Sequence, residues 1–153
     1  MKSNLPRLVP SKGCILVPVR ILIADDSKFI RLILRGLIRS TDVGKHADII
    51  EAHDGTDAVR KYFQYNPHLV FLDINMPNMS GLEVLHKIKS KDPNAKIIVI
   101  SALGHEELVR KALEKGVLGY ITKPFHPNLL KEILRNVLGG DKHAEEASSS
   151  TCR

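Results

Sequence analysis

The stretch HLVFLDINMP, residues 68–77, decides the fold that this sequence predicts. Its four consecutive large apolar residues lie between two prolines, a pattern typical of a short strand buried on both faces of a parallel sheet. Asp73 ends the apolar run, so its carboxylate is expected at the carboxyl edge of the sheet, where open α/β sheets bind ligands. Taken alone, the stretch is equally compatible with Asp73 capping a turn.

Working outward, the chain repeats one unit, an apolar strand followed by a helix. Further strand-like runs lie at residues 20–24, 48–52, 96–100 and 117–122. Apolar residues at helical spacing follow each strand, with helices expected after Ser27, after a turn at Asp54-Gly55, from Ser80, from about His105 to Lys115, and up to Leu138. Strands that alternate with helices predict an α/β fold, in which right-handed crossovers build a five-stranded parallel sheet covered by helices on both faces.

Composition limits the classes of function. The 153 residues are 43% hydrophobic and 26% charged, as expected for one globular domain. The net charge of +6 is scattered over predicted helix faces, and aromatic residues make up only 5% with no Trp, so no nucleic-acid partner is expected. Cys14 and Cys152, near opposite ends, suggest neither a disulfide framework nor a metal site.

The domain boundaries follow from where periodic patterning begins and ends. Residues 1–18 lack an apolar period and are interpreted as an N-terminal extension, with translation starting near Val19 as an alternative. Pro18 and Arg20 interrupt its apolar run, which excludes a secretory signal or membrane span and favours the cytoplasm. One folded domain is predicted at 19–138, followed by a disordered tail at 139–153 that leaves no room for a second, output domain.

Functional side chains follow four of the predicted strands. Asp25 and Asp26, Asp73, Ser101 and Lys123 end strands one, three, four and five, so all are expected on one edge of the sheet. Converging carboxylates raise one another's pKa unless a cation lies among them, and an all-oxygen set suits Mg²⁺. A hydroxyl, an ammonium and a divalent ion around a carboxylate predict phosphoryl transfer with Asp73 as nucleophile.

Four motifs carry a resemblance to a known family. They lie at residues 22–27, at 72–77 followed by Gly81, at 100–102 and at 120–125. In this order and at these separations, over about residues 19–138, the chain resembles a receiver domain of two-component response regulators. The resemblance implies a flavodoxin-like, doubly wound sheet with strand order 2-1-3-4-5. It also implies a phosphorylation-activated signalling switch that phosphorylates and dephosphorylates itself, rather than a multiple-turnover enzyme.

The resemblance further implies a role for each residue of the acidic motif. Asp73 matches the phosphoacceptor, which receives its phosphoryl group from a histidine kinase. Asp26 and Asp73 match the side-chain ligands of Mg²⁺, and Asn75 would add its backbone carbonyl. Asp25 matches an acid that helps to hold the metal, partly through water.

The remaining motifs imply how the signal is passed on. Lys123 would pair with Asp73 and then with the phosphoryl oxygens, and the Lys123–Pro124 bond resembles a cis peptide of the family. Ser101 would hydrogen-bond the new phosphoryl group. Tyr120 matches an aromatic switch residue whose movement would alter a surface made by the fourth helix, fifth strand and fifth helix.

Alternatives remain open for function and for partners. A phosphatase with an aspartyl intermediate would need a second Asp where Asn75 stands, and a flavodoxin-like cofactor binder would need a phosphate loop where Asp25 and Asp26 repel phosphate. Single-domain receivers resemble chemotaxis regulators, which bind a motor component, and also phosphorelay intermediates that pass phosphate to another histidine protein. The cations of the first helix and of Arg110, Lys111 and Lys115 suggest an acidic partner.

Overall fold

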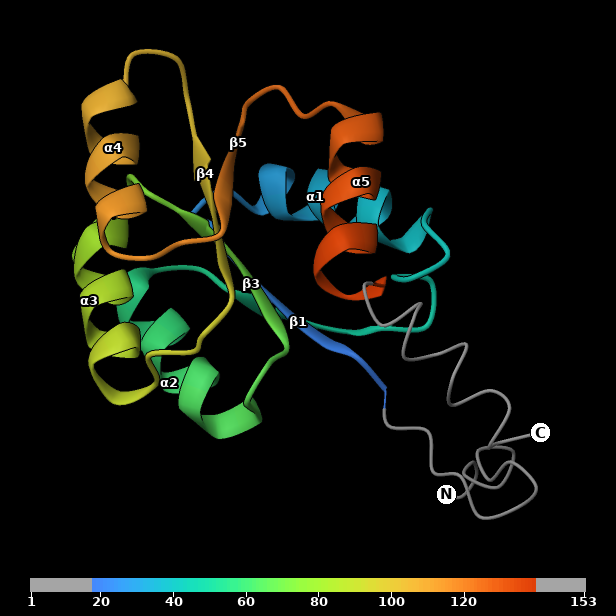
Figure 1. Cartoon of the computed structure of the whole chain (residues 1–153), viewed down its shortest axis with the longest axis horizontal. Coiled ribbons are helices and arrows are strands. Elements are labelled where there is room, and N and C mark those ends of the chain that lie inside the picture. The colour runs from blue at the N-terminus through green and yellow to red at the C-terminus, as the bar shows by residue number, and fades with distance from the viewer. Residues whose placement is uncertain (1–17, 140–153) are drawn as a thin grey trace.

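The computed structural model describes residues 18–139, and strands alternate with helices throughout this part of the chain (Figure 1). The predictions for the extension and the tail lie outside the described residues, apart from Pro18 and Gly139. The elements are β1 (Arg20–Ala24), α1 (Lys28–Arg39), β2 (Asp48–Ala52), α2 (Gly55–Tyr65), β3 (Leu69–Asp73), α3 (Gly81–Lys91), β4 (Ile97–Ser101), α4 (Glu106–Glu114), β5 (Gly119–Thr122) and α5 (Pro127–Val137).

The five strands form one parallel sheet in the order β2-β1-β3-β4-β5, which confirms the predicted fold class and strand order. The register aligns the carboxyl ends of the inner strands. Ala24 lies opposite Leu72, so Asp25, the next residue after β1, is level with Asp73 at the end of β3. Ser101 at the end of β4 lies opposite Thr122, the residue before Lys123.

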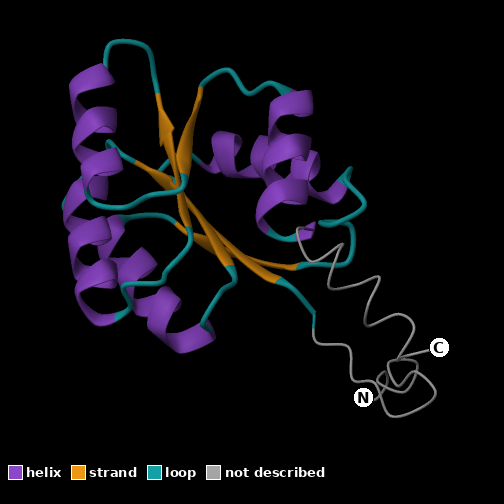
Figure 2. Cartoon of the chain, in the orientation of Figure 1, coloured by secondary structure: helices purple, strands orange, loops and turns teal. Residues whose placement is uncertain are grey.

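Helices cover both faces of the sheet, with α2, α3 and α4 on one side and α1 and α5 on the other (Figures 1 and 2). Each face has its own apolar core, and alternate residues of β3 divide between them. Val70 and Leu72 pack in the first core, and Leu69 and Phe71 in the second. All five residues of β3 are buried, as the uninterrupted apolar run predicted.

Several element boundaries differ from the sequence-based expectation. Helix α1 ends at Arg39 rather than near Gly44. Gly55 is not a turn residue but the first residue of α2, because the Asp54 side chain accepts a hydrogen bond from the Asp57 N–H and caps the helix. The position has to be Gly, since a Cβ there would lie 2.5 Å from the Met79 carbonyl oxygen.

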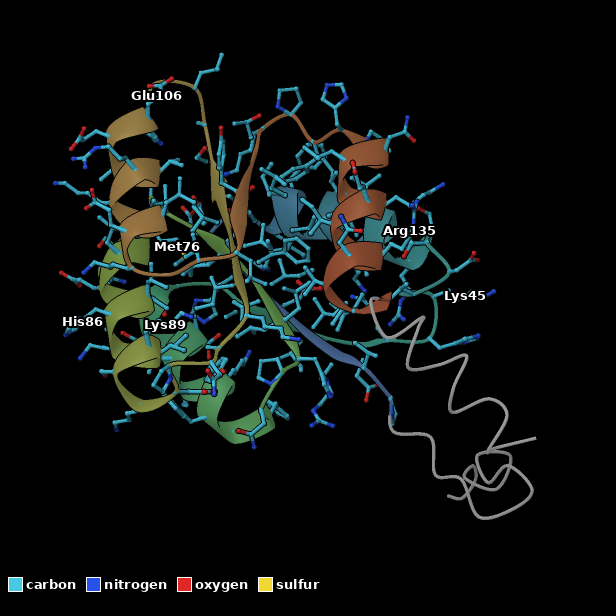
Figure 3. All side chains as sticks on the ribbon, in the orientation of Figure 1. Lys45, Met76, His86, Lys89, Glu106 and Arg135 are labelled. Atoms are coloured by element: carbon cyan, nitrogen blue, oxygen red, sulfur yellow. The ribbon has the colours of Figure 1, made fainter. Side chains whose placement is uncertain are left out.

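Charged side chains project from the helices and turns in many directions, as Glu106 and Arg135 on helices and Lys45 on the turn after α1 do in Figure 3. This arrangement agrees with the scattered charge that was read from the sequence. Two apolar residues expected in helix cores, Phe63 and Leu129, instead have 38% and 43% of their surface exposed. Among residues 18–139, none of the helices has the length and apolar character needed to cross a membrane.

Candidate functional site

Three aspartates meet at the carboxyl edge of the sheet. Asp25 and Asp26 follow β1, Asp73 ends β3, and one carboxylate oxygen of each lies within 4.8 Å of those of the other two. Asp25 and Asp73 are buried, whereas Asp26 is exposed to solvent. The predicted convergence of these acids is therefore confirmed, and they form a centre with one side open to solvent.

Local backbone hydrogen bonds orient two of the carboxylates. Asp25 Oδ1 accepts the N–H of Ser27 at 2.9 Å, and Asp73 Oδ1 accepts the N–H of Asn75 at 3.1 Å. Ser27 in turn caps α1 by accepting the Ile30 N–H. Asp73 thus does hold a turn, the alternative reading of its stretch, and one of its oxygens still belongs to the acidic cluster.

Lys123 supplies a fixed positive charge from the end of β5. Its ammonium nitrogen lies 3.1 Å from Asp25 Oδ2 and 3.6 Å from Asp73 Oδ2. It therefore bridges both buried acids and is nearer to Asp25, although the family resemblance implied a pairing with Asp73. The Lys123–Pro124 peptide bond is cis, as the resemblance implied.

The electrostatic environment of Asp73 disfavours its charged form. Burial, together with the negative charges of Asp25 and Asp26, raises the pKa of Asp73 to about 6, against the opposing effects of the Asn75 N–H and the Lys123 charge. Asp25 Oδ2 is buried and accepts no hydrogen bond, so the ion pair with Lys123 is its one close compensation among the described residues. This excess of buried negative charge is what a bound cation would relieve.

The donor set indicates the kind of cation. Asp25, Asp26 and Asp73 offer carboxylate oxygens only, and the cluster contains no His or Cys. Hard divalent ions such as Mg²⁺ prefer oxygen ligands and keep some of their water, which the exposed side at Asp26 permits. The residues present therefore fit a Mg²⁺ ion.

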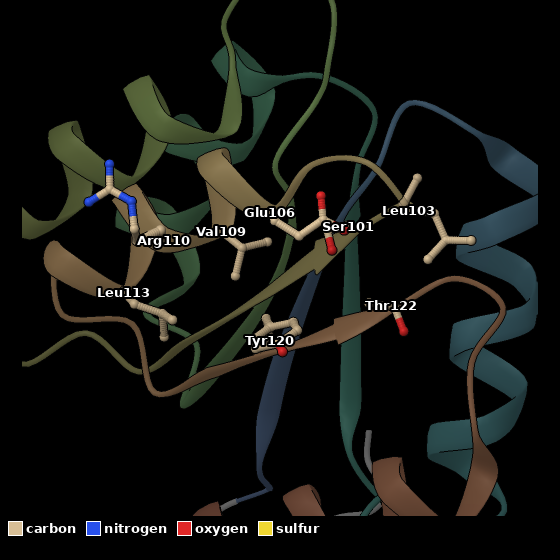
Figure 4. A pocket seen from close by; sticks show the side chains of 9 residues that line it. Ser101, Leu103, Glu106, Val109, Arg110, Leu113, Tyr120 and Thr122 are labelled. Carbon is tan, nitrogen blue, oxygen red and sulfur yellow. The ribbon is translucent and has the colours of Figure 1, made fainter.

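A groove lies between α4 and β5, next to the end of β4 (Figure 4). It measures about 280 Å³, and its lining includes Ser101, Val109, Leu113, Tyr120 and Thr122. Ser101 is buried at the end of β4, whereas the Tyr120 side chain on β5 is 48% exposed. The predicted hydroxyl and the predicted aromatic switch residue therefore line the same groove.

Two charged residues beside the centre were missed from the sequence. Arg31 was expected on the solvent side of the first helix, but its side chain is only 13% exposed, and Nη1 donates a hydrogen bond to the Asp25 carbonyl oxygen at 2.7 Å. Its Nε donates to Glu51 Oε1 at 2.9 Å. The available signal was Glu51 itself, a carboxylate that follows Ile49 and Ile50 inside the strand at residues 48–52.

The charged face of α4 is partly neutralised. Arg110 forms ion pairs with Glu107 and Glu114 on the same helix, so its charge is not free for a partner as the sequence suggested. Lys111 and Lys115 make no ion pair among the described residues. The positive surface proposed for an acidic partner is therefore smaller than expected.

Known proteins resemble this chain over nearly all of its described part. The family model of the response regulator receiver domain matches residues 21–135. The chemotaxis protein CheY of Listeria monocytogenes is 40% identical over 116 residues, covering 76% of this chain and 95% of that protein. CheY of Thermotoga maritima is 42% identical over 118 residues, covering 77% and 96%. Among solved structures, the receiver domain of NtrX from Brucella abortus has a TM-score of 0.71 at 29% identity, covering 78% of this chain and 98% of that one.

Proposed function

This chain belongs to the response regulator receiver domain family, and from that premise we propose that it is a phosphorylation-activated switch with Asp73 as phosphoacceptor. A histidine kinase is the proposed phosphodonor. The observation that carries the proposal is the position of Asp73, buried between two further acids and within 3.6 Å of the Lys123 ammonium. Family membership favours this switch over a phosphatase or a flavodoxin-like cofactor binder.

The proposed reaction transfers one phosphoryl group. A carboxylate oxygen of Asp73 attacks the phosphorus of a phosphohistidine, an O–P bond forms, the N–P bond breaks, and the electron pair returns to the imidazole of the donor. Asp25, Asp26 and Asp73, with the backbone carbonyl of Asn75, would hold a Mg²⁺ ion. When bound, that ion supplies positive charge that offsets the negative charge of the transferring group.

Two side chains complete the proposed phosphoryl site. The Lys123 ammonium already faces Asp73 Oδ2 and would pair with the oxygens of the arriving phosphoryl group. Ser101, at the end of the adjacent strand, would donate its hydroxyl hydrogen bond to the same group. Lys123 already pairs with the carboxylates of Asp25 and Asp73 and would gain the added negative charge of the phosphoryl oxygens, whereas the hydrogen bond from Ser101 would form only after the phosphoryl group arrives.

The output would be read at the groove beside α4. Movement of Ser101 towards a phosphoryl group would leave room for the Tyr120 ring to turn inward between Val109 and Leu113. Such a shift would change the surface of α4, β5 and α5 and so the affinity for a partner. The CheY relatives make a motility partner the proposed reader, with a phosphorelay as the alternative destination of the phosphoryl group.

The phosphoacceptor is tested by mass spectrometry after incubation with acetyl phosphate and Mg²⁺. We expect one phosphoryl mass on the wild-type protein and none on Asp73→Asn. Asp42→Asn is the matched control, because the Asp42 side chain is fully exposed in the structure and lies outside the acidic cluster. An adduct that persists on Asp73→Asn would contradict the proposal.

The destination of the signal is tested by a pull-down with the phosphorylated protein. Retention of a motility component by the wild type but not by Asp73→Asn supports the motor partner. Transfer of the phosphoryl group to a histidine protein instead would identify the chain as a relay intermediate.

A further inference from the structure

Arg31 of α1 reaches back to the turn that carries the acids. Its Nη1 donates to the carbonyl oxygen of Asp25 at 2.7 Å. That carbonyl belongs to the peptide unit that joins Asp25 to Asp26. A rotation of this peptide unit would move the Asp26 carboxylate, so the hydrogen bond from Arg31 helps to set the angle between two candidate metal ligands.

Arg31 is itself held in place from the neighbouring strand. Its Nε donates to Glu51 Oε1 at 2.9 Å, and the other oxygen of Glu51 accepts a hydrogen bond from Arg35 at 3.2 Å. The Arg31 side chain is 13% exposed and that of Glu51 29%, so the pair is shielded from much of the solvent. Glu51 also offsets the charge of Arg31, which therefore adds little repulsion towards a nearby cation.

The other polar atoms of Asp25 have separate partners. Its N–H donates to the Ala52 carbonyl oxygen, Oδ1 accepts from the Ser27 N–H, and Oδ2 faces Lys123. Only the Asp25 carbonyl oxygen depends on Arg31. Removing the Arg31 side chain therefore releases one atom of the turn and leaves all three carboxylates and Lys123 in the protein.

We infer that Arg31, braced by Glu51, is a positioning residue for the divalent cation at Asp25, Asp26 and Asp73. The inference rests on the proposed function, because it concerns the affinity of the same acidic centre. Arg31 is not a ligand; it orients the backbone that presents the ligands. Partners of this outer kind typically change metal affinity by about 10- to 100-fold when they are removed.

Arginine suits this role better than lysine. The guanidinium is planar and donates in two fixed directions at once, here to the Asp25 carbonyl and to the Glu51 carboxylate. A lysine ammonium could keep the charge, but it would not hold both acceptors in the same geometry. The conservative substitution is therefore expected to restore only part of the effect.

The test measures Mg²⁺ binding by titration calorimetry on the whole chain. Arg31→Met is expected to weaken Mg²⁺ binding by about tenfold, and Arg31→Lys by less. Arg35→Met is the matched control. It removes one positive charge from the same helix and one hydrogen bond to the same partner, Glu51, but Arg35 does not contact Asp25. Its Mg²⁺ affinity is expected to stay within about twofold of wild type.

A second measurement, the Mg²⁺ dependence of the phosphorylation rate, distinguishes a change in Mg²⁺ affinity from a loss of the phosphorylation reaction itself. With acetyl phosphate as donor, the Mg²⁺ concentration that gives half the maximal phosphorylation rate should rise about tenfold in Arg31→Met, with the maximal rate largely retained. Glu51→Gln weakens the brace without touching Arg31, because it removes the negative charge and one of the two acceptor oxygens that Arg31 and Arg35 share, and it should weaken Mg²⁺ binding severalfold. It replaces Arg31→Met if thermal unfolding shows that Arg31→Met does not fold.

Two results would overturn the inference: Mg²⁺ affinity unchanged in Arg31→Met and Glu51→Gln, or an equal loss in Arg35→Met. The first would show that the turn keeps its geometry unaided, and the second that only net charge matters. A wild-type protein that neither binds Mg²⁺ nor accepts a phosphoryl group would instead contradict the proposed function, so the two failures are distinguishable.

Discussion

Asp73 is the proposed phosphoacceptor, and the fold keeps its carboxylate in an unfavourable electrostatic position. Burial and two neighbouring acids raise its pKa from the ordinary 3.8 to about 6. The folded protein therefore binds this proton more tightly than the unfolded chain does. Between about pH 4 and pH 6, this raised pKa makes the folded state lose stability as the pH rises, and above pH 6 the whole penalty is present.

It follows that Asp73→Asn should stabilise the protein when Mg²⁺ is absent. We expect the free energy of unfolding at pH 7.5 to rise by an amount on the order of 1 kcal/mol, since partial solvent access at the site reduces the full linkage value. The gain should shrink as the pH falls through 6 and vanish below about pH 3.8, where Asp73 is protonated in the folded and unfolded states alike. Urea unfolding of both proteins in EDTA at several pH values measures the difference.

The comparison with Mg²⁺ provides the control for this prediction. A bound cation compensates the charge of Asp73 in the wild type, whereas Asp73→Asn should bind Mg²⁺ more weakly. Added Mg²⁺ should therefore reduce or reverse the gain in the free energy of unfolding that Asp73→Asn shows without the ion. A stability difference that did not change with pH would show that packing, and not the charge of Asp73, separates the two proteins.

At the scale of elements, two glycines at helix positions differ sharply in what surrounds them. A Cβ on Gly81, the first residue of α3, would lie 2.5 Å from the Asp73 carbonyl oxygen and 2.5 Å from Ile74 Cα. A Cβ on Gly36, within the exposed surface of α1, would meet nothing within 4 Å. The start of α3 therefore needs Gly for its close approach to the end of β3, whereas α1 does not need Gly at position 36.

The two glycines form a matched pair of substitutions. Gly81→Ala should destabilise the protein by about 1–3 kcal/mol, because backbone atoms cannot move aside as a flexible side chain would. Gly36→Ala should stabilise it by about 0.5–1 kcal/mol, because Ala is the better helix former. Chemical denaturation of the two variants checks both signs, and a loss of stability in Gly36→Ala would show that α1 is less regular than described.

The groove between α4 and β5 gives a second prediction at this scale. Phosphorylation should carry the Tyr120 ring from its half-exposed position into the groove. Fluorine NMR of protein labelled with fluorotyrosine measures the solvent exposure of each ring before and after addition of acetyl phosphate and Mg²⁺. Tyr62, which is buried, and Tyr65, which is 41% exposed, are internal controls that should not change. Equal changes at all three rings would indicate a general loosening rather than a switch.

Elements that are determined by neighbouring residues in the sequence could be predicted, whereas features that depend on contacts between distant segments could not. Strand β3 was predictable because burial on both faces requires an uninterrupted apolar run. The start of α3 at Ser80 was predictable from its cap, and Ser80 Oγ does accept the Glu83 N–H. Arg31 and Gly55 could not be predicted, because their roles depend on contacts with Glu51 and Met79, which lie 20 or more residues away in the sequence.

At the scale of the whole molecule, a cation at the acidic centre should stabilise the fold. The three acids come from two strands and the compensating lysine from a third, so a bound Mg²⁺ favours the assembled sheet over the unfolded chain. Stability should rise with Mg²⁺ and reach a gain of about 1.4 kcal/mol when its concentration is ten times the dissociation constant. Comparing thermal unfolding in Mg²⁺ with thermal unfolding in NaCl of equal ionic strength measures the stabilisation that is due to Mg²⁺ binding. This stabilisation should be largely lost in Asp26→Asn.

The sequence predicted which residues meet at the site, but it did not predict the distances between them. Parallel strands place their carboxyl ends on one edge, so four strand ends were enough to bring Asp25, Asp26, Asp73, Ser101 and Lys123 together. Which acid lies nearest to Lys123 depends on side-chain conformations and on the twist of the sheet. Residue spacing in the sequence contains no information on either of these, so the sequence did not predict that Lys123 lies closer to Asp25 than to Asp73.

During synthesis, the ribosome adds the three acids of the site well before it adds Lys123. Asp25, Asp26 and Asp73 are translated early, but Lys123 directly follows β5, the last strand made and an outer strand of the sheet. A nascent chain that has not yet added β5 holds the carboxylates without their fixed cation. If the proposed function is correct, the unfinished protein should be a poor phosphoryl acceptor until residue 123 has left the ribosome and β5 has joined the sheet.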